Sequence, residues 1–160
     1  MRRLLFALLL SAVLPHAGAE PLLKSQLSTR IALNLAAAKQ ISNAAEAEAR
    51  RNGWNVSIVV VDDAGALMHA LRMDDTPNNS LPIALAKATH AANFRRDTKF
   101  HEDILTKGNQ LVLALPDAMP LEGGVRLLVD GKLIGAIGVS GVQAPQDGQI
   151  ARAGAALLAP

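Results

Sequence analysis

The feature that most constrains the fold is the dipeptide Asp130-Gly131, which lies between two apolar segments. Asp-Gly is a preferred pair for the two-residue turn that joins adjacent antiparallel strands. Residues 125–129 and 132–140 flank this turn and contain Val and Ile, which favour strands. These residues therefore predict a β-hairpin near the end of the chain.

A second hairpin is predicted earlier in the chain. Residues 56–62 form a run rich in β-branched side chains, and residues 66–73 form a second strand after the turn Asp63-Ala64-Gly65. A further short strand is predicted over residues 111–115. Since both hairpins pair neighbouring segments, the sheet is expected to be antiparallel, with about five strands in total.

Helical segments are predicted where apolar residues recur every three or four positions. The predicted helices run from Ser25 or Ser28 to about Asn52, and over residues 81–94, 98–107 and 146–158. Helices that separate and follow hairpins indicate an α+β fold, with the helices packed on the sheet.

The first 19 residues resemble a targeting segment rather than part of the fold. Arg2 and Arg3 precede an apolar run over residues 4–13, and Ala17-Gly18-Ala19 supplies the small residues of a cleavage site. We therefore expect a cleavable signal peptide, a single domain over residues 20–160 and a periplasmic or secreted location. No stable membrane anchor is expected after cleavage, because the apolar run is too short to span a bilayer of ~30 Å.

Charge and composition narrow the classes of partner. Removing residues 1–19 takes away two arginines and no acidic residue, which leaves 14 basic and 14 acidic residues. This balance gives no electrostatic reason to expect nucleic acid as a partner. The sequence contains no cysteine, which excludes disulfides, thiolate metal sites and a cysteine nucleophile.

The predicted helix over residues 81–94 carries the most informative polar side chains. Its residues Ile83, Lys87, His90 and Phe94 are spaced by four, three and four positions, so they share one face. On the rim of a pocket, Lys87 can bind a carboxylate and His90 can act as a ligand or hydrogen-bond partner. The alternative is a solvated or interface face on which the lysine lies along apolar surface.

Three histidines, His69, His90 and His101, follow the predicted cleavage point. Their spacing matches no zinc pattern, which argues against a structural metal site. A single axial ligand of haem iron needs no such spacing, so His90 and His101 are candidate iron ligands.

Glycines cluster at both ends of the last hairpin. Gly123-Gly124 precedes it, and Gly135, Gly138 and Gly141 interrupt its second strand. Glycine weakens a strand unless something must approach its backbone closely. That neighbour is a ligand, a helix or another subunit, and the spacing is not that of a dinucleotide-binding loop.

Several of these segments resemble the GlcG/HbpS-type haem-binding family, which is related to the C-terminal domain of PduO-type corrinoid adenosyltransferases. The resemblance covers roughly residues 27–158, and its most specific part is Gly135–Gly141, which reads Gly-Ala-Ile-Gly-Val-Ser-Gly. The other similar stretches are Val59–Gly65, Arg72-Met73-Asp74, Ile83–Ala88, Glu122-Gly123-Gly124 and Asp130–Gly135.

The resemblance implies a profilin-like α/β/α sandwich around a central antiparallel sheet, a homo-oligomer, and haem or a related tetrapyrrole as the ligand. On this hypothesis His90 or His101 contacts the iron, and Lys87 or Arg72 pairs with a propionate. The other residues expected at the cofactor site are Gly123, Gly124 and Ser140.

Two other functions remain open. The first is an enzyme or accessory protein that acts on a small carboxylate metabolite. In that case Arg72, Lys87 and the backbone amides of Gly123-Gly124 hold the anion, while Asp62 or His90 acts as the base. The second is a structural role in which the glycine-rich strand serves only as a subunit interface.

Overall fold

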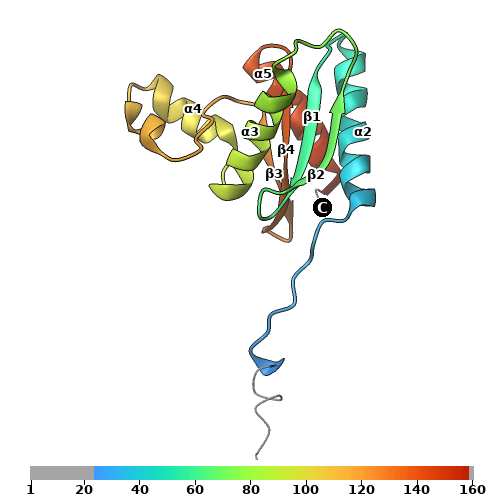
Figure 1. The fold of residues 1–160 in the computed structure, drawn as a ribbon, viewed down its shortest axis with the longest axis vertical. Coiled ribbons are helices and arrows are strands. Elements are labelled where there is room, and N and C mark those ends of the chain that lie inside the picture. The colour runs from blue at the N-terminus through green and yellow to red at the C-terminus, as the bar shows by residue number, and fades with distance from the viewer. Residues whose placement is uncertain (1–23, 159–160) are drawn as a thin grey trace, which may run out of the picture. The chain divides into compact units, whose positions relative to one another are not determined.

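The fold is built on a four-stranded antiparallel sheet (Figure 1). The structure is a computed structural model that describes residues 24–158. Both predicted hairpins form, and β1 pairs with β4 to join them into one sheet of order β2-β1-β4-β3. The strands are β1 (Ser57–Asp62), β2 (Leu67–Arg72), β3 (Gly124–Val129) and β4 (Lys132–Ser140).

Residues 24–30 belong to a separate unit from the domain that begins at Ile31. They contain a turn closed by a hydrogen bond from the Leu27 amide to the Lys24 carbonyl oxygen (3.3 Å). The predicted signal peptide, residues 1–19, lies outside the described residues. No helix within residues 24–158 is both long enough and apolar enough to cross a bilayer.

Helices cover both faces of the sheet. α2 and α5 pack against each other and against one face, whereas α3 packs against the other face. The alternation of side chains along β1 explains these layers, because Ile58 faces the core under α2 and α5 while Val59 faces α3. The predicted α+β class and α/β/α sandwich are confirmed. The helical elements are α2 (Leu35–Arg51), α3 (Ser80–Asn93), α4 (Thr98–Thr106), α5 (Ala144–Ala155), and the 3₁₀ helices η1 (Gln110–Ala114) and η2 (Ala156–Leu158).

The first helix begins later than the sequence predicts. Ser25 or Ser28 is the expected start, but α2 begins at Leu35. The side-chain oxygen of Asn34 accepts a hydrogen bond from the Ala37 amide at 2.9 Å, which satisfies one free donor of the first turn. Asn34 therefore caps this helix in place of the two serines.

The predicted fifth strand, over residues 111–115, does not form. Gln110–Ala114 is the 3₁₀ helix η1 instead. The Asn109 side chain accepts a hydrogen bond from the Leu111 amide at 3.1 Å, and this contact favours a tight turn over an extended strand. The sheet therefore has four strands rather than about five.

The outer edge of β3 is covered by the link between α3 and α4. Asp97 Oδ1 accepts a hydrogen bond from the Arg126 amide (3.1 Å), and Thr98 Oγ1 accepts one from the Gly124 amide (2.9 Å). Because these edge donors are already satisfied, no further strand pairs there.

Two of the clustered glycines allow α3 to approach the sheet closely. A Cβ atom at Gly138 would lie 2.0 Å from the Ala84 carbonyl oxygen, and one at Gly124 would lie 2.3 Å from the Lys87 carbonyl oxygen. The close neighbour at both glycines is therefore a helix of the same chain, rather than a ligand or another subunit. The interpretation of this strand as purely a subunit interface is therefore wrong for Gly138.

Candidate functional site

The side chain of Lys87 lies in the protein interior and is 0% exposed. Its Nζ atom donates hydrogen bonds to Asp147 Oδ2 (2.8 Å) and to the carbonyl oxygen of Val139 (3.1 Å). Asp147 lies in the first turn of α5, where the helix dipole favours a negative charge. The ion pair therefore ties α3, on one face of the sheet, to α5 on the other.

Gly123 makes room for this ion pair. A Cβ atom there would lie 2.8 Å from Lys87 Nζ and 2.9 Å from Asp147 Cβ. Burial raises the pKa of the Asp147 carboxyl, whereas the Lys87 ammonium and the hydrogen bond from the Val142 amide act in the opposite direction. The amine of Lys87 is thus engaged by Asp147 and Val139 within the protein.

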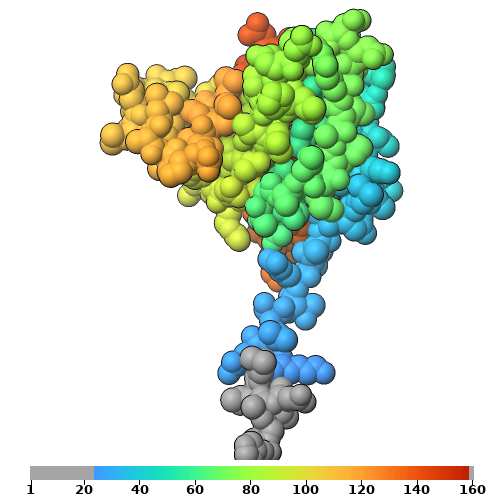
Figure 2. All heavy atoms as spheres, viewed as in Figure 1, coloured from blue at the N-terminus to red at the C-terminus, as the bar shows by residue number. Residues whose placement is uncertain are grey.

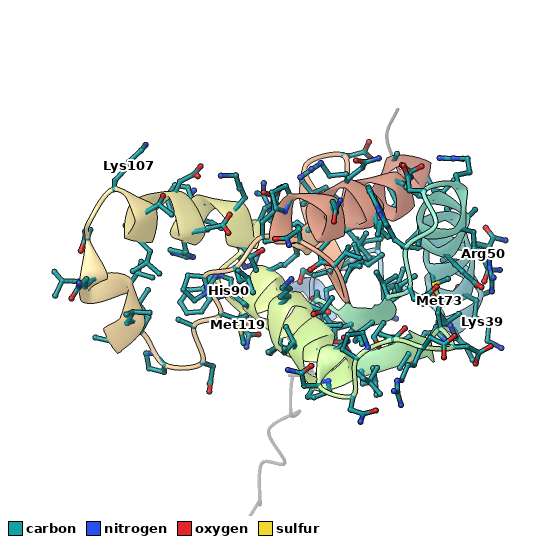
Figure 3. All side chains as sticks on the ribbon, turned by 90° about the horizontal axis from the view of Figure 1, so that it is seen from above. Lys39, Arg50, Met73, His90, Lys107 and Met119 are labelled. Atoms are coloured by element: carbon teal, nitrogen blue, oxygen red, sulfur yellow. The ribbon has the colours of Figure 1, made fainter. Side chains whose placement is uncertain are left out.

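His90 and His101 are brought together, although they belong to different helices. His90 Nε2 lies 2.8 Å from His101 Nδ1, and His90 Nδ1 accepts a hydrogen bond from the Met119 amide at 2.8 Å. Figure 3 shows His90 and Met119 next to each other on the side of α3 that faces α4. His90 therefore connects three segments: α3, α4 and the link that leads to β3.

These hydrogen bonds assign the tautomers of both rings. His90 Nδ1 accepts a proton from a backbone amide, so the neutral ring carries its own proton on Nε2. That proton is donated to His101 Nδ1, so the neutral His101 ring carries its proton on Nε2. In this arrangement neither ring has a free nitrogen lone pair for a metal ion.

Both histidines are buried and hold their neutral forms. Burial lowers the pKa of His90 from 6.5 to about 4, and the charge that His101 would carry adds to this effect. Burial also lowers the pKa of His101, and the nearby Arg96 guanidinium lowers it further. The pair is therefore uncharged at neutral pH.

Aromatic rings surround the histidine pair. Phe94 lies 4.5 Å from the His90 ring and 5.2 Å from the His101 ring, measured between centroids. Phe100 contacts His101 at 5.1 Å, and the Arg96 guanidinium lies 4.4 Å from the Phe100 centroid. Figure 2 shows the segment held by these contacts, α4 and η1, as a lobe at the left of the domain; we call it the arm.

A hollow of about 380 Å³ lies between α3 and the link before β3. We call it the α3 hollow. Its volume falls in the range typical of small-ligand sites. Its walls are mainly apolar, and it is lined by Pro82, Leu85, Ala86, Thr89, Asp117, Ala118 and Met119.

A second hollow, of about 230 Å³, lies on the other side of Pro82 and Leu85. Its remaining walls are Val59, Leu67, Ala70 and Leu81, all of them apolar. Pro82 and Leu85 line both hollows. The helix α3 therefore presents apolar surface towards β2 and also towards residues 117–119, in the link before β3. This surface can accept a flat, apolar ligand.

The other predicted site residues lie elsewhere. Arg72, on β2, donates hydrogen bonds to the Thr76 carbonyl oxygen and to Asn78 Oδ1, both at 2.8 Å. Ser140 is buried at the end of β4, where it pairs with Ser57 of β1. The structure therefore groups Lys87 with Gly123, and His90 with His101, but does not gather all the predicted residues around one ligand.

The residues of the α3 hollow were not identified from the sequence. The sequence does contain a signal for one wall, because a spacing of zero, three, four and seven positions marks one face of a helix. The residues with this spacing are Pro82, Leu85, Ala86 and Thr89. Nothing in the sequence placed Met119 opposite that face. Among residues 24–158, no group of three or more His, Asp or Glu side chains is arranged to hold a metal ion.

Sequence comparison identifies a matching family profile and a similar known protein. The sequence profile of the family described as "Haem degrading protein HbpS-like" matches residues 33–156. Protein GlcG of Escherichia coli K12 is 43% identical over 114 residues, which cover 71% of this chain and 85% of GlcG.

Solved structures of similar proteins share the fold. A crystal structure of a double mutant of Streptomyces reticuli HbpS aligns with a TM-score of 0.76 and 32% identity, covering 84% of this chain and 92% of that one. The crystal structure of a PduOC:heme complex aligns with a TM-score of 0.74 and 29% identity, covering 81% of this chain and 96% of that one.

Proposed function

This chain belongs to the HbpS-like family of haem degrading proteins, and from that membership we propose that it binds haem or a related tetrapyrrole in the α3 hollow. The observation that carries the proposal is the mainly apolar hollow of about 380 Å³ beside α3. The similarity to a protein whose structure is a heme complex supports the choice of ligand.

The lining of the α3 hollow suits a porphyrin. A porphyrin is a flat, largely apolar ring, and Pro82, Leu85 and Ala86 offer an apolar wall from α3. No lysine or arginine lines the hollow, so the haem propionates remain in solvent in this proposal. Haem, when bound, supplies an iron centre for ligand exchange or electron transfer. The protein contributes the apolar wall and shields one face of the ring from water.

Filling the α3 hollow is expected to weaken binding. Ala86→Leu adds bulk to a wall of the hollow, so we expect the hemin dissociation constant to rise by about tenfold or more. Titration followed by the Soret absorption band measures this change.

Ala47→Leu is the matched control, because Ala47 is an exposed position on α2 and its substitution leaves the hollow unchanged. Equal hemin affinities for both variants would contradict binding in the α3 hollow. Incubating the complex with a reductant and dioxygen then separates the two activities: a stable Soret band indicates binding alone, and loss of the band indicates degradation.

We further propose that the protein is exported and forms a homo-oligomer. The predicted signal peptide over residues 1–19 supports export. The arm and the link that follows it carry the exposed residues Leu111 (76%), Leu113 (61%) and Leu121 (40%). Exposed apolar side chains grouped in this way are typical of a protein interface, and a second copy would cover them.

Charged residues on the arm are expected to dissociate the oligomer. Leu111→Glu combined with Leu113→Glu places two carboxylates in the proposed interface, so light scattering after size exclusion should give the monomer mass. Leu157→Glu, at an exposed leucine on η2, is the control and should leave the mass unchanged. A wild-type monomer, or an unchanged mass for the double variant, would contradict this interface.

A further inference from the structure

Three residues that line the α3 hollow have side chains with atoms that can bind a metal. They are the Thr89 hydroxyl, the Asp117 carboxylate and the Met119 thioether. Haem iron in proteins is held mainly by histidine, cysteine, methionine or tyrosine side chains. Met119 is the only one of these four types among the lining residues.

The histidines nearest to Met119 are engaged with other groups. His90 uses Nδ1 to accept the Met119 amide proton, and its Nε2 proton is shared with His101. The remaining nitrogen of His101 carries the proton that the hydrogen-bond pattern requires. Iron ligation by either ring would break this buried pair or demand an imidazolate.

The backbone of Met119 is fixed on both sides. Its amide donates to His90 Nδ1 (2.8 Å), and its carbonyl oxygen accepts a hydrogen bond from the Leu121 amide (2.8 Å). The His90 ring that accepts the first bond is itself 1% exposed and packed against Phe94. A ligand residue needs this kind of rigid support, because an unsupported side chain loses affinity to its own conformational freedom.

From these observations we infer that Met119 is the axial iron ligand supplied by this chain, with its thioether sulfur bound to haem iron in the α3 hollow. The inference rests on the proposed function. The hydrogen bond from the Met119 amide to His90 ties the proposed ligand residue to the buried histidine pair, which does not line the hollow. Methionine ligation stabilises ferrous iron, so the bound haem should have a raised reduction potential.

Met119→Leu tests the inference, because leucine keeps the apolar wall and removes the sulfur. Wild-type protein with hemin is expected to show the weak charge-transfer band of a thioether–iron bond, and the variant should lack it. The reduction potential of the bound haem should also fall in the variant. Met68→Leu is the matched control, because Met68 on β2 packs against the core under α2 and α5.

Iron-free protoporphyrin distinguishes porphyrin binding in the α3 hollow from iron ligation by Met119. It requires no iron ligand, so wild type and Met119→Leu should bind it with dissociation constants that agree within about twofold. Absence of binding of both hemin and protoporphyrin by the wild type would overturn the proposed function. Normal hemin binding with the same spectrum and potential in Met119→Leu would overturn the assignment of Met119 alone.

Discussion

Replacing Lys87 with methionine is expected to lower the free energy of unfolding by about 3–5 kcal/mol, because the substitution leaves a buried carboxylate without its counter-charge. Asp147 is 2% exposed, so water cannot solvate the unpaired charge. Methionine is unbranched and flexible enough to fill most of the space of the lysine chain, which keeps the loss of packing small. Urea denaturation near neutral pH measures the change.

A second variant separates the charge from the packing. Lys87→Met combined with Asp147→Asn removes the unpaired charge and keeps an oxygen that can accept the Val142 amide (3.2 Å), so at least half of the lost stability should return. Lys99→Met is the control, because the exposed Lys99–Asp103 pair should be worth less than about 1 kcal/mol. Equal losses for Lys87→Met and Lys99→Met, or no recovery in the double variant, would contradict the structural role of the pair.

Acidification is expected to destabilise the protein through His90, by about 3 kcal/mol once the pH reaches about 4. The pKa of His90 is about 4 in the folded protein, against 6.5 for an unperturbed histidine. As the pH falls through 6.5, the unfolded chain takes up a proton that the folded protein does not bind until about 4. The stabilisation that neutral His90 contributes is therefore complete above pH 6.5 and decreases as the pH falls from 6.5 to about 4. Urea denaturation across this range measures the decrease.

His90→Gln tests the contribution of the buried histidine pair, since His101 loses its titrating partner in this variant. Glutamine does not titrate, and its side-chain oxygen can still accept the Met119 amide proton. The raised pKa of Asp147 acts with the opposite sign, since the folded protein binds that proton more readily, and it is common to both proteins. The difference in stability between wild type and His90→Gln should therefore shrink or reverse on acidification. A difference that stays constant from about pH 7.5 to about pH 4.5 would show that His90 is not a buried neutral acceptor.

The fold could be predicted where a local turn signal in the sequence joins two strands that pair with each other. Asp130-Gly131 specified the turn between β3 and β4, and that hairpin forms over nearly the predicted residues. The predicted strand over residues 111–115 is wrong, because Asn109 caps a 3₁₀ helix there and the β3 edge nearest in sequence is already occupied. Asp97 and Thr98 cover that edge from a distant part of the chain, and no local pattern reports this.

The site was harder to predict than the fold. The spacing of Lys87 and His90 correctly placed both on α3, and both are buried in the structure. Lys87 meets Asp147, which is 60 positions away in the sequence. His90 meets His101 and Met119, which are 11 and 29 positions away. Periodicity reports which face of a helix a residue occupies, but not which distant group meets it. The charge of Lys87 is paired with Asp147 within the protein, and its predicted role in ligand binding stays a prediction.

A crystal structure of the protein with bound hemin is the decisive test of haem binding in the α3 hollow. We expect porphyrin density in the α3 hollow, against Pro82 and Ala86, with the iron within bonding distance of the Met119 sulfur. Porphyrin density at another place on the protein, with the α3 hollow empty, would contradict this expectation.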